Sequence, residues 1–401
     1  MDGVLLKACI RIRISSTIIK KLQMIRKKFK RISYGVLGDR NFYFKTAFRN
    51  ISISRNISLA VFMDLMNFSI YEYSVPMKKP MFWDKRQGFF IVIFDDLGCK
   101  GVGEAAPLPG YSRENIESVR KQLFECVEGK IPEIFFPSVR MGMEMAMLDL
   151  TKRQTEVTLR HLFSESFLDV IEIGRLLLAE DSCVFEKFLS LLKEGNKTIR
   201  LKVGRQEVEK DLKVVQNLCK KIDEEVSLSL DVDGIWDINT AVDFGKKCSS
   251  LPIKYIEEPI NDPKHLRDFF FSTGIQVALD QTLIKYPDVD LNGISGLHSI
   301  TLKPTVLGGF DTVGNWINRA KEIALPFIIS SSFETSFGIL SLANFFAAVS
   351  NESSLAGIDT FSLFSDDVFS VPLVIKEGKL DLNAYDKSEI DFSKEWIKRI
   401  A

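Results

Sequence analysis

The stretch "KTIRLKVGRQ", residues 197–206, alternates apolar and basic side chains, which is the pattern of a strand with two different faces. Ile199 and Leu201 suit a buried face, and the opposite face carries Arg200 and Lys202. Lysine and arginine are rarely buried unless they meet an opposite charge. The lysine near the end of this strand therefore indicates a charged partner or a site on the face that it occupies.

Short apolar runs of this kind recur after about residue 168, with amphipathic, helix-like stretches between them. Strands that alternate with helices in this number close readily into a (β/α)8-type barrel. A doubly wound open sheet is the competing architecture, but no glycine-rich fingerprint follows the first run. We therefore predict an α/β fold with a barrel whose eight strands lie within 170–179, 198–204, 226–233, 253–259, 275–281, 299–305, 326–332 and 357–363.

An α+β capping domain is expected before the barrel, because strand patterns precede helical patterns over residues 66–165. The barrel itself is expected over 166–365. The last segment, 366–401, shows a hairpin pattern with a turn at Glu377–Gly378, and we expect it to pack back on the capping domain. The helices expected in the capping domain span 110–129 and 138–154.

The first 65 residues differ in composition from the rest, with fourteen lysines and arginines but only three acidic residues. Such a segment can be a basic arm for nucleic acid or membrane, or a transit-type presequence. Alternatively it lies upstream of the true start, because Met66 opens a stretch that already has the pattern of a first strand. We favour this last interpretation and expect residues 1–65 to be a disordered or non-native extension.

The composition indicates a globular chain, with 46% hydrophobic and 26% charged residues and a net charge of zero. Zero net charge gives no reason to expect a nucleic-acid partner. No apolar run is long enough for stable membrane insertion. Six scattered cysteines without a CxxC pair favour a reduced, cytoplasmic compartment. These properties leave the oligomeric state open.

Five charged residues stand near the carboxyl ends of five consecutive predicted strands: Lys202, Asp231, Glu257, Asp280 and Lys303. A barrel gathers these strand ends around one mouth, where barrel active sites are built. One such residue is usually a solvated loop neighbour, but five in register predict a shared pocket. Three carboxylates there would repel one another without a counter-ion. Oxygen ligands favour Mg²⁺, with Mn²⁺ as a possible substitute, and the three histidines lie away from these positions, which argues against zinc.

Lys202 and Lys303 flank the predicted metal site. Burial and a nearby cation both disfavour the ammonium form, so we expect the pKa of both lysines to be depressed. Either lysine could then act as a general base near neutral pH.

Five motifs stand in order along the chain: "RLKVG" (200–204), "LDVDGIW" (230–236), "IEEP" (256–259), "ALDQTL" (278–283) and "LKPTVLGG" (302–309). With them, the chain from about residue 66 resembles the o-succinylbenzoate synthases of the muconate-lactonizing subgroup of the enolase superfamily. The resemblance implies that Lys202 is the acid/base and Lys303 the opposite lysine. It also implies that Asp231, Glu257 and Asp280 bind Mg²⁺.

Three positions depart from the pattern of that family. Arg200 replaces the usual first lysine, and as a permanent cation it cannot be a base. Asp233 stands where asparagine is usual, and the sequence leaves open whether it supports the metal site or pairs with Arg200. Gln281 replaces a common glutamate, which removes one negative charge.

The resemblance implies a hydro-lyase of menaquinone biosynthesis, which dehydrates 2-succinyl-6-hydroxy-2,4-cyclohexadiene-1-carboxylate to 2-succinylbenzoate. The partner is then a small-molecule carboxylate. Its succinyl arm is expected against the loop "SSSFETSFG" (330–338), and helix capping by Ser332 or Thr335 is an equally good interpretation of that loop. The substrate-binding candidates are Arg200, Tyr111, Ser330, Ser331, Ser332 and Glu334.

Two other classes of function stay open at this point. The same scaffold, with a lysine on each face, suits an N-succinylamino acid racemase, a dipeptide epimerase or a cycloisomerase. A non-enzymatic barrel with the basic arm as a tether is the other class, and the five charged positions weigh against it.

Overall fold

The computed structural model describes residues 67–78, 83–130, 132–351 and 354–401. All of them belong to one compact unit, Leu59–Ala401. The predicted N-terminal extension, 1–65, lies outside the described residues. Within them, no helix is both long and apolar enough to cross a membrane.

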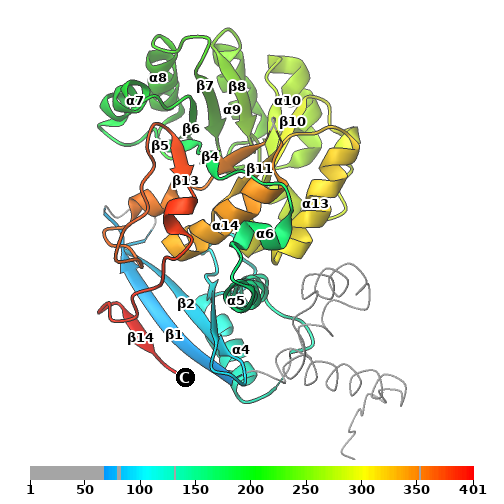
Figure 1. The fold of residues 1–401 in the computed structure, drawn as a ribbon. Coiled ribbons are helices and arrows are strands. Elements are labelled where there is room, and N and C mark those ends of the chain that lie inside the picture. The colour runs from blue at the N-terminus through cyan, green and yellow to red at the C-terminus, as the bar shows by residue number, and fades with distance from the viewer. Residues whose placement is uncertain (1–66, 79–82, 131, 352–353) are drawn as a thin grey trace, which may run out of the picture. The chain divides into compact units, whose positions relative to one another are not determined.

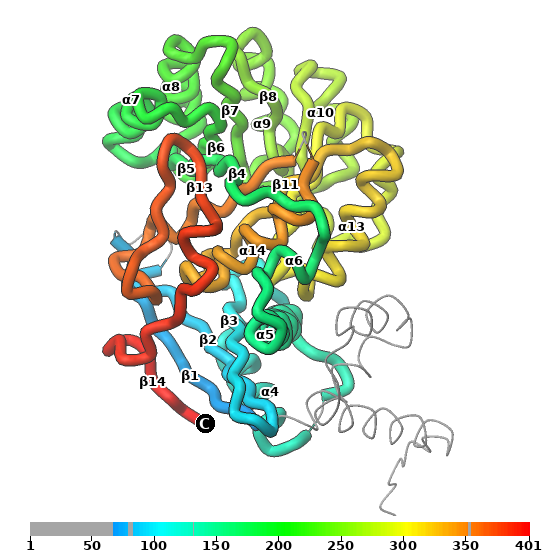
Figure 2. The backbone as a smooth tube through the Cα atoms, viewed as in Figure 1, coloured from blue at the N-terminus to red at the C-terminus, as the bar shows by residue number. Residues whose placement is uncertain are grey.

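The N-terminal part of the unit is an antiparallel sheet in the order β14-β1-β2-β3. Its outer strand β14 comes from the C-terminus and pairs with β1, so the end of the chain returns to the first strand, as Figure 2 shows. The strands are β1 (Asn67–Pro76), β2 (Lys85–Phe94), β3 (Lys100–Ala105) and β14 (Ile397–Arg399).

Two helices, α4 (Ile116–Val127) and α5 (Pro137–Thr155), accompany this sheet, and they confirm the two predicted helices. Helix α5 approaches β3 very closely because glycines stand at the contact. A Cβ atom added at Gly103 would lie 1.8 Å from the carbonyl oxygen of Gly142. The methionine-rich stripe of α5 is buried core, which fixes the helix on the sheet.

The barrel is a parallel eight-stranded sheet in the order β12-β11-β10-β9-β8-β7-β6-β5. A parallel bridge between Ile173 and Ala356 joins its two ends, so the ring is closed. Helices lie outside the ring of strands in Figure 1. The strands are β5 (Arg175–Leu178), β6 (Thr198–Lys202), β7 (Ser227–Asp231), β8 (Ile253–Glu257), β9 (Val277–Leu279), β10 (Leu297–Leu302), β11 (Phe327–Ser330) and β12 (Leu355–Gly357).

Alternation along these strands separates two sets of side chains. Leu201, Leu230 and Ile256 are fully buried in the main core, which includes residues of the outer helices. The residues between them point into the ring. The helices that follow the strands are α7 (Val184–Lys193), α8 (Val208–Cys219), α9 (Ile238–Cys248), α10 (Leu266–Thr273), α11 (Gln281–Lys285), α12 (Pro304–Leu307), α13 (Phe310–Glu322) and α14 (Ser336–Val349).

Two predicted strands differ from the observed ones. The run 170–179 is divided into β4 (Val170–Glu172), which pairs with β13 (Lys379–Asp381), and the barrel strand β5. The run 357–363 is mainly a 3-10 helix, Asp359–Leu363, that follows β12. The buried carboxylate of Asp359 accepts hydrogen bonds from Arg175 Nε and the Leu176 amide, and this contact turns the chain away from a strand.

The predicted turn at Glu377–Gly378 is present, with both residues at positive φ. It is closed by a single bridge between Lys376 and Lys379 rather than by a full hairpin. The second arm, β13, pairs with β4 instead and forms a two-stranded sheet with it. The short helix α6 (Leu159–Phe163) precedes β4 along the chain.

Candidate active site

The structure brings together all five charged residues that the sequence singled out. Lys202, Asp231 and Glu257 are the last residues of β6, β7 and β8, and they stand opposite one another in the strand register. Asp280 directly follows β9, and Lys303 directly follows β10. Five neighbouring strands therefore present their charges at the same, carboxyl end of the barrel.

Opposite charges are paired in this ring. Lys202 Nζ lies 2.9 Å from Asp231 Oδ2, and Lys303 Nζ donates to Asp280 Oδ2. Arg200 lies one layer deeper, with a guanidinium nitrogen 3.5 Å from Glu257 Oε2. Burial of these groups strengthens each attraction relative to water and makes any unpaired charge costly.

Glu257 is the carboxylate with the fewest partners. It is 0% exposed, and neither side-chain oxygen accepts a hydrogen bond from the described residues. Burial, and next the charge of Asp231, raise the pKa of Glu257 to about 8. Apart from the Arg200 guanidinium at 3.5 Å, no donor among the described residues satisfies this buried carboxylate, and a bound cation would supply further positive charge.

The donor set fits a hard divalent cation, since three carboxylates of neighbouring strands face one mouth. In the part of the chain that the structure describes, however, no group of three or more Asp, Glu, His or Cys side chains already has the spacing of a metal site. The reason is visible in the ion pairs, because lysine ammonium groups take up oxygens of Asp231 and Asp280. The three carboxylates have the chemistry that a divalent ion requires, and two of them, Asp231 and Asp280, are ion-paired with lysines.

The expected depression of the lysine pKa values depends on a bound metal ion and stays a prediction, because the protein groups alone shift the pKa of Lys303 the other way. Burial lowers the pKa of this lysine, but Asp280, Glu257 and Asp231 raise it further, and the net direction is upward. The prediction had weighed burial and a metal ion, whereas in this arrangement the carboxylates are the nearest charges.

Asp233, which the sequence left undecided, meets Lys202 rather than Arg200. Its Oδ1 lies 2.6 Å from Lys202 Nζ, and its Oδ2 lies 3.6 Å from a guanidinium nitrogen of Arg205. Asp233 has a left-handed backbone, φ 60°, next to Gly234 at φ 65°. Arg205 lies in the stretch 197–206, but a single basic residue after a strand gave no signal of this role.

Tyr111 reaches the ring from the loop that follows β3. Its hydroxyl donates to Asp233 Oδ1, and its ring centroid lies 4.7 Å from Lys303 Nζ. Gln281 supports the same corner, because its amide donates to the backbone oxygen of Asp233 at 3.0 Å. Tyr111 thus lies over the group of five charged residues, between Lys202 and Lys303.

The serine-rich loop after β11 is buried. Ser330 Oγ lies 3.2 Å from the Gly357 carbonyl oxygen, and Ser331 Oγ lies 2.8 Å from Thr360 Oγ1. Ser332 Oγ is also buried but has no hydrogen-bond partner among the described residues.

Glu334 and Thr335 complete this loop. The carboxylate of Glu334 accepts from the Ser332 amide within the loop and from the Thr305 hydroxyl of α12, so it fixes the loop to that helix. Thr335 stands at the N-cap of α14 but makes no side-chain capping bond there. Its hydroxyl donates instead to Glu104 Oε2 at 2.8 Å.

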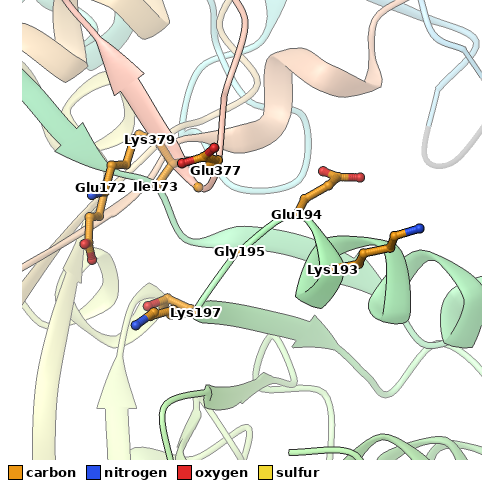
Figure 3. Close-up of a pocket in the computed structure, with 10 residues that line it drawn as sticks. Glu172, Ile173, Lys193, Glu194, Gly195, Lys197, Glu377 and Lys379 are labelled. Atoms are coloured by element: carbon orange, nitrogen blue, oxygen red, sulfur yellow. The ribbon is translucent and has the colours of Figure 1, made fainter.

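A hollow of about 530 Å³ lies elsewhere, at the amino end of β6, and Figure 3 shows it. Its lining includes Glu172, Lys197, Glu377 and Lys379, a mixture of both charges. Lys197 precedes β6, whereas Lys202 ends it, so the strand separates the hollow from the charged ring by ~17 Å. The hollow therefore has no part in the chemistry of the ring.

Comparison with known proteins identifies relatives of both parts of the chain. The family model "Enolase C-terminal domain-like" matches residues 185–385, and "MenC, N-terminal domain" matches residues 65–150. The o-succinylbenzoate synthase of Vibrio cholerae serotype O1 is 30% identical over 74% of this chain and 90% of the relative. That of Aliivibrio salmonicida is 27% identical over the same shares. A solved structure of muconate lactonizing enzyme from Pseudomonas fluorescens has a TM-score of 0.70 at 18% identity, over 82% of this chain and 96% of that one, which supports the fold alone.

Proposed function

The chain belongs to the o-succinylbenzoate synthase family of the enolase superfamily, and from this membership we propose how its charged ring acts. The enzyme is a carbon–oxygen lyase that converts 2-succinyl-6-hydroxy-2,4-cyclohexadiene-1-carboxylate to 2-succinylbenzoate, a step of menaquinone biosynthesis. One observation carries the site assignment: two lysines and three carboxylates from five strands meet at one end of the barrel.

The three carboxylates Asp231, Glu257 and Asp280 would hold Mg²⁺, for which Mn²⁺ is a substitute. The two oxygens of Glu257, which accept no hydrogen bond from the described residues, support this assignment. When bound, the ion would supply positive charge against the two oxyanions of an enediolate and would disfavour the ammonium form of nearby lysines.

Lys202 is the base that removes the proton α to the substrate carboxylate, and it returns that proton to the departing hydroxide. Its side chain is 11% exposed, so little water competes with the substrate for it. Lys303 faces the ring from another strand, and its positive charge stabilises the anion that forms. Arg200 adds a permanent positive charge below Glu257.

Tyr111 and the loop Ser330, Ser331, Ser332 and Glu334 enclose the substrate in this proposal. The buried, unpartnered hydroxyl of Ser332 supports a polar contact with the succinyl arm. Glu334 serves by holding the loop, because it accepts from the Ser332 amide within the loop and from the Thr305 hydroxyl of α12. The cytoplasm is the compartment that we propose, since the five cysteines in the described residues are all free thiols.

Turnover of the cyclohexadiene substrate tests the proposal most simply. The purified protein is expected to form the aromatic product, seen by its ultraviolet absorbance, with Mg²⁺ and not with EDTA. A protein that forms no product under either condition would refute the proposed function.

Racemisation of an N-succinylamino acid is the second candidate, favoured by the presence of a lysine on two separate strands of the ring. Both reactions begin with removal of an α-proton, so exchange of that proton with solvent does not separate them alone. The two are distinguished when the products are compared: a racemase in D₂O inverts and labels the α-carbon of an amino acid, whereas the dehydratase leaves it unchanged.

A further inference from the structure

Arg86 in β2 is a buried arginine whose hydrogen bonds all go to backbone oxygens, and its guanidinium lies 5.9 Å from the centroid of the Trp83 ring. It is 2% exposed, and no carboxylate lies within ion-pair distance among the described residues. Its five N–H donors meet five carbonyl oxygens at 2.7–3.1 Å, those of Gln87, Ala106, Pro107, Ser332 and Phe333.

Burial of a guanidinium without a carboxylate is unfavourable unless every donor is hydrogen-bonded. Here the planar fork fits a cage of carbonyl dipoles, and all five donors are used. Lysine has three donors on a flexible stem and cannot fill the same cage. The position therefore requires arginine for its shape as well as for its charge.

The cage joins two parts of the molecule. Gln87, Ala106 and Pro107 follow or belong to the N-terminal sheet region, whereas Ser332 and Phe333 belong to the loop after the barrel strand β11. Arg86 is thus a direct link between the N-terminal part and the loop that carries Ser330, Ser331 and Ser332.

The loop depends on this link because its backbone is strained. Phe333 has φ 59°, a left-handed conformation that is unfavourable for a residue with a side chain. Its carbonyl accepts from Arg86 Nε at 3.0 Å, and its ring packs edge-on against Trp83 with centroids 5.3 Å apart. Contacts from the N-terminal part therefore hold the loop in a shape that it would not otherwise keep.

Glu104 in β3 makes a second link at the far end of the same loop. Its carboxylate accepts from the Thr335 amide at 2.9 Å, the Thr335 hydroxyl at 2.8 Å and the Gly338 amide at 3.0 Å. A Cβ atom at Gly338 would lie 2.6 Å from Glu104 Oε2, so this approach requires the glycine. The N-terminal sheet therefore fixes the loop at its middle, through Arg86, and at its end, through Glu104.

We propose that Arg86 is a positioning residue for the succinyl arm of the substrate, and that it acts with Glu104 by setting the shape of the loop Ser330–Thr335. Neither residue touches the reacting atoms in this inference, which rests on the proposed function. Loss of the link should weaken binding of the arm in the ground state and the transition state alike. Such a loss raises KM and leaves kcat nearly unchanged.

The test compares Arg86→Lys and Glu104→Gln with a matched control, Arg160→Lys. Arg160 is 1% exposed, and all three of its guanidinium nitrogens are hydrogen-bonded, but to side chains outside the loop, among them Asp169 and Asp386. KM, kcat and the melting temperature are measured for each protein. We expect KM to rise about tenfold with kcat within threefold for the first two variants, and KM to stay unchanged in the control despite its lower melting temperature.

Three outcomes would overturn the inference. KM values of Arg86→Lys and Glu104→Gln within twofold of the wild-type value, with an active wild type, refute it and leave the proposed function intact. An equal rise of KM in Arg160→Lys would show that general destabilisation is the cause. A wild-type protein without turnover would remove the proposed function and this inference with it. If Arg86→Lys does not fold, the isosteric Glu104→Gln decides between the same outcomes.

Discussion

Removal of divalent cations should destabilise the protein, and Glu257 should carry most of that effect. Two buried oxygens of Glu257 have no hydrogen-bond partner, and Asp231 and Asp280 add negative charge beside it. A bound cation relieves this burial of negative charge only in the folded state. Mg²⁺ therefore raises the free energy of unfolding, whereas the Glu257→Gln variant loses a ligand and most of this response.

The size of the effect follows from linkage. At a free Mg²⁺ concentration one hundred times the dissociation constant, a ligand that binds only the folded state stabilises it by about 2.7 kcal/mol. The unit Leu59–Ala401 has roughly 340 residues, for which an unfolding entropy of ~2.1 cal/mol/K per residue gives ~0.7 kcal/mol/K. The melting temperature should therefore rise by about 4 °C.

Differential scanning fluorimetry in EDTA and in excess Mg²⁺ measures this shift. Glu144→Gln is the matched control, because Glu144 is a largely buried carboxylate of α5 that accepts from the Phe310 amide, away from the ring. The control should keep the full shift, and Glu257→Gln should keep less than half of it. Equal melting temperatures of the wild type with and without Mg²⁺, or a full response of Glu257→Gln, would refute the reasoning.

Two further predictions concern stability. Burial raises the pKa of Glu104 and of Glu144 to about 7, so the folded state binds more protons than the unfolded state between pH 4.5 and 7. The contribution of each group is complete below pH 4.5 and is lost as the pH rises to 7, by at most ~3 kcal/mol. The free energy of unfolding, measured in urea, should accordingly fall less between pH 5.5 and pH 8 in Glu144→Gln than in the wild type. An equal fall in both proteins would contradict the raised pKa of Glu144. Gly103→Ala should destabilise by about 1–3 kcal/mol or more because its Cβ meets the Gly142 carbonyl at 1.8 Å. Gly314→Ala in α13, where nothing lies within 4 Å, should be neutral or stabilising, and similar values for both alanine variants would argue against close packing of α5 on β3.

The sequence predicted the barrel because its strands repeat one simple requirement. Each strand buries one apolar face against helices. Residues on that face, such as Leu201 and Ile256, are apolar at every second position, and this pattern is visible in the sequence. The last strand was placed too late because the buried carboxylate of Asp359 binds β5, and a single aspartate in an apolar run does not reveal such a contact.

The charged ring could be predicted because its members share a position in a repeating unit. Arg86 and Glu104 could not, since each is one charged residue in a strand, and its partners in the loop after β11 lie more than 200 residues away. The partner of Asp233 and the direction of the Lys303 pKa likewise depend on distances between side chains, which spacing along the chain does not fix.

The central claim is that Lys202, at the end of β6, takes the proton whose removal begins the dehydration. The most direct measurement is the rate of aromatic product formation by the wild type and by Lys202→Ala, both saturated with Mg²⁺ and both shown to be folded. The account predicts that the variant forms product about 10³-fold more slowly, as expected for loss of a general base. A variant that keeps a rate within tenfold of the wild type would contradict it.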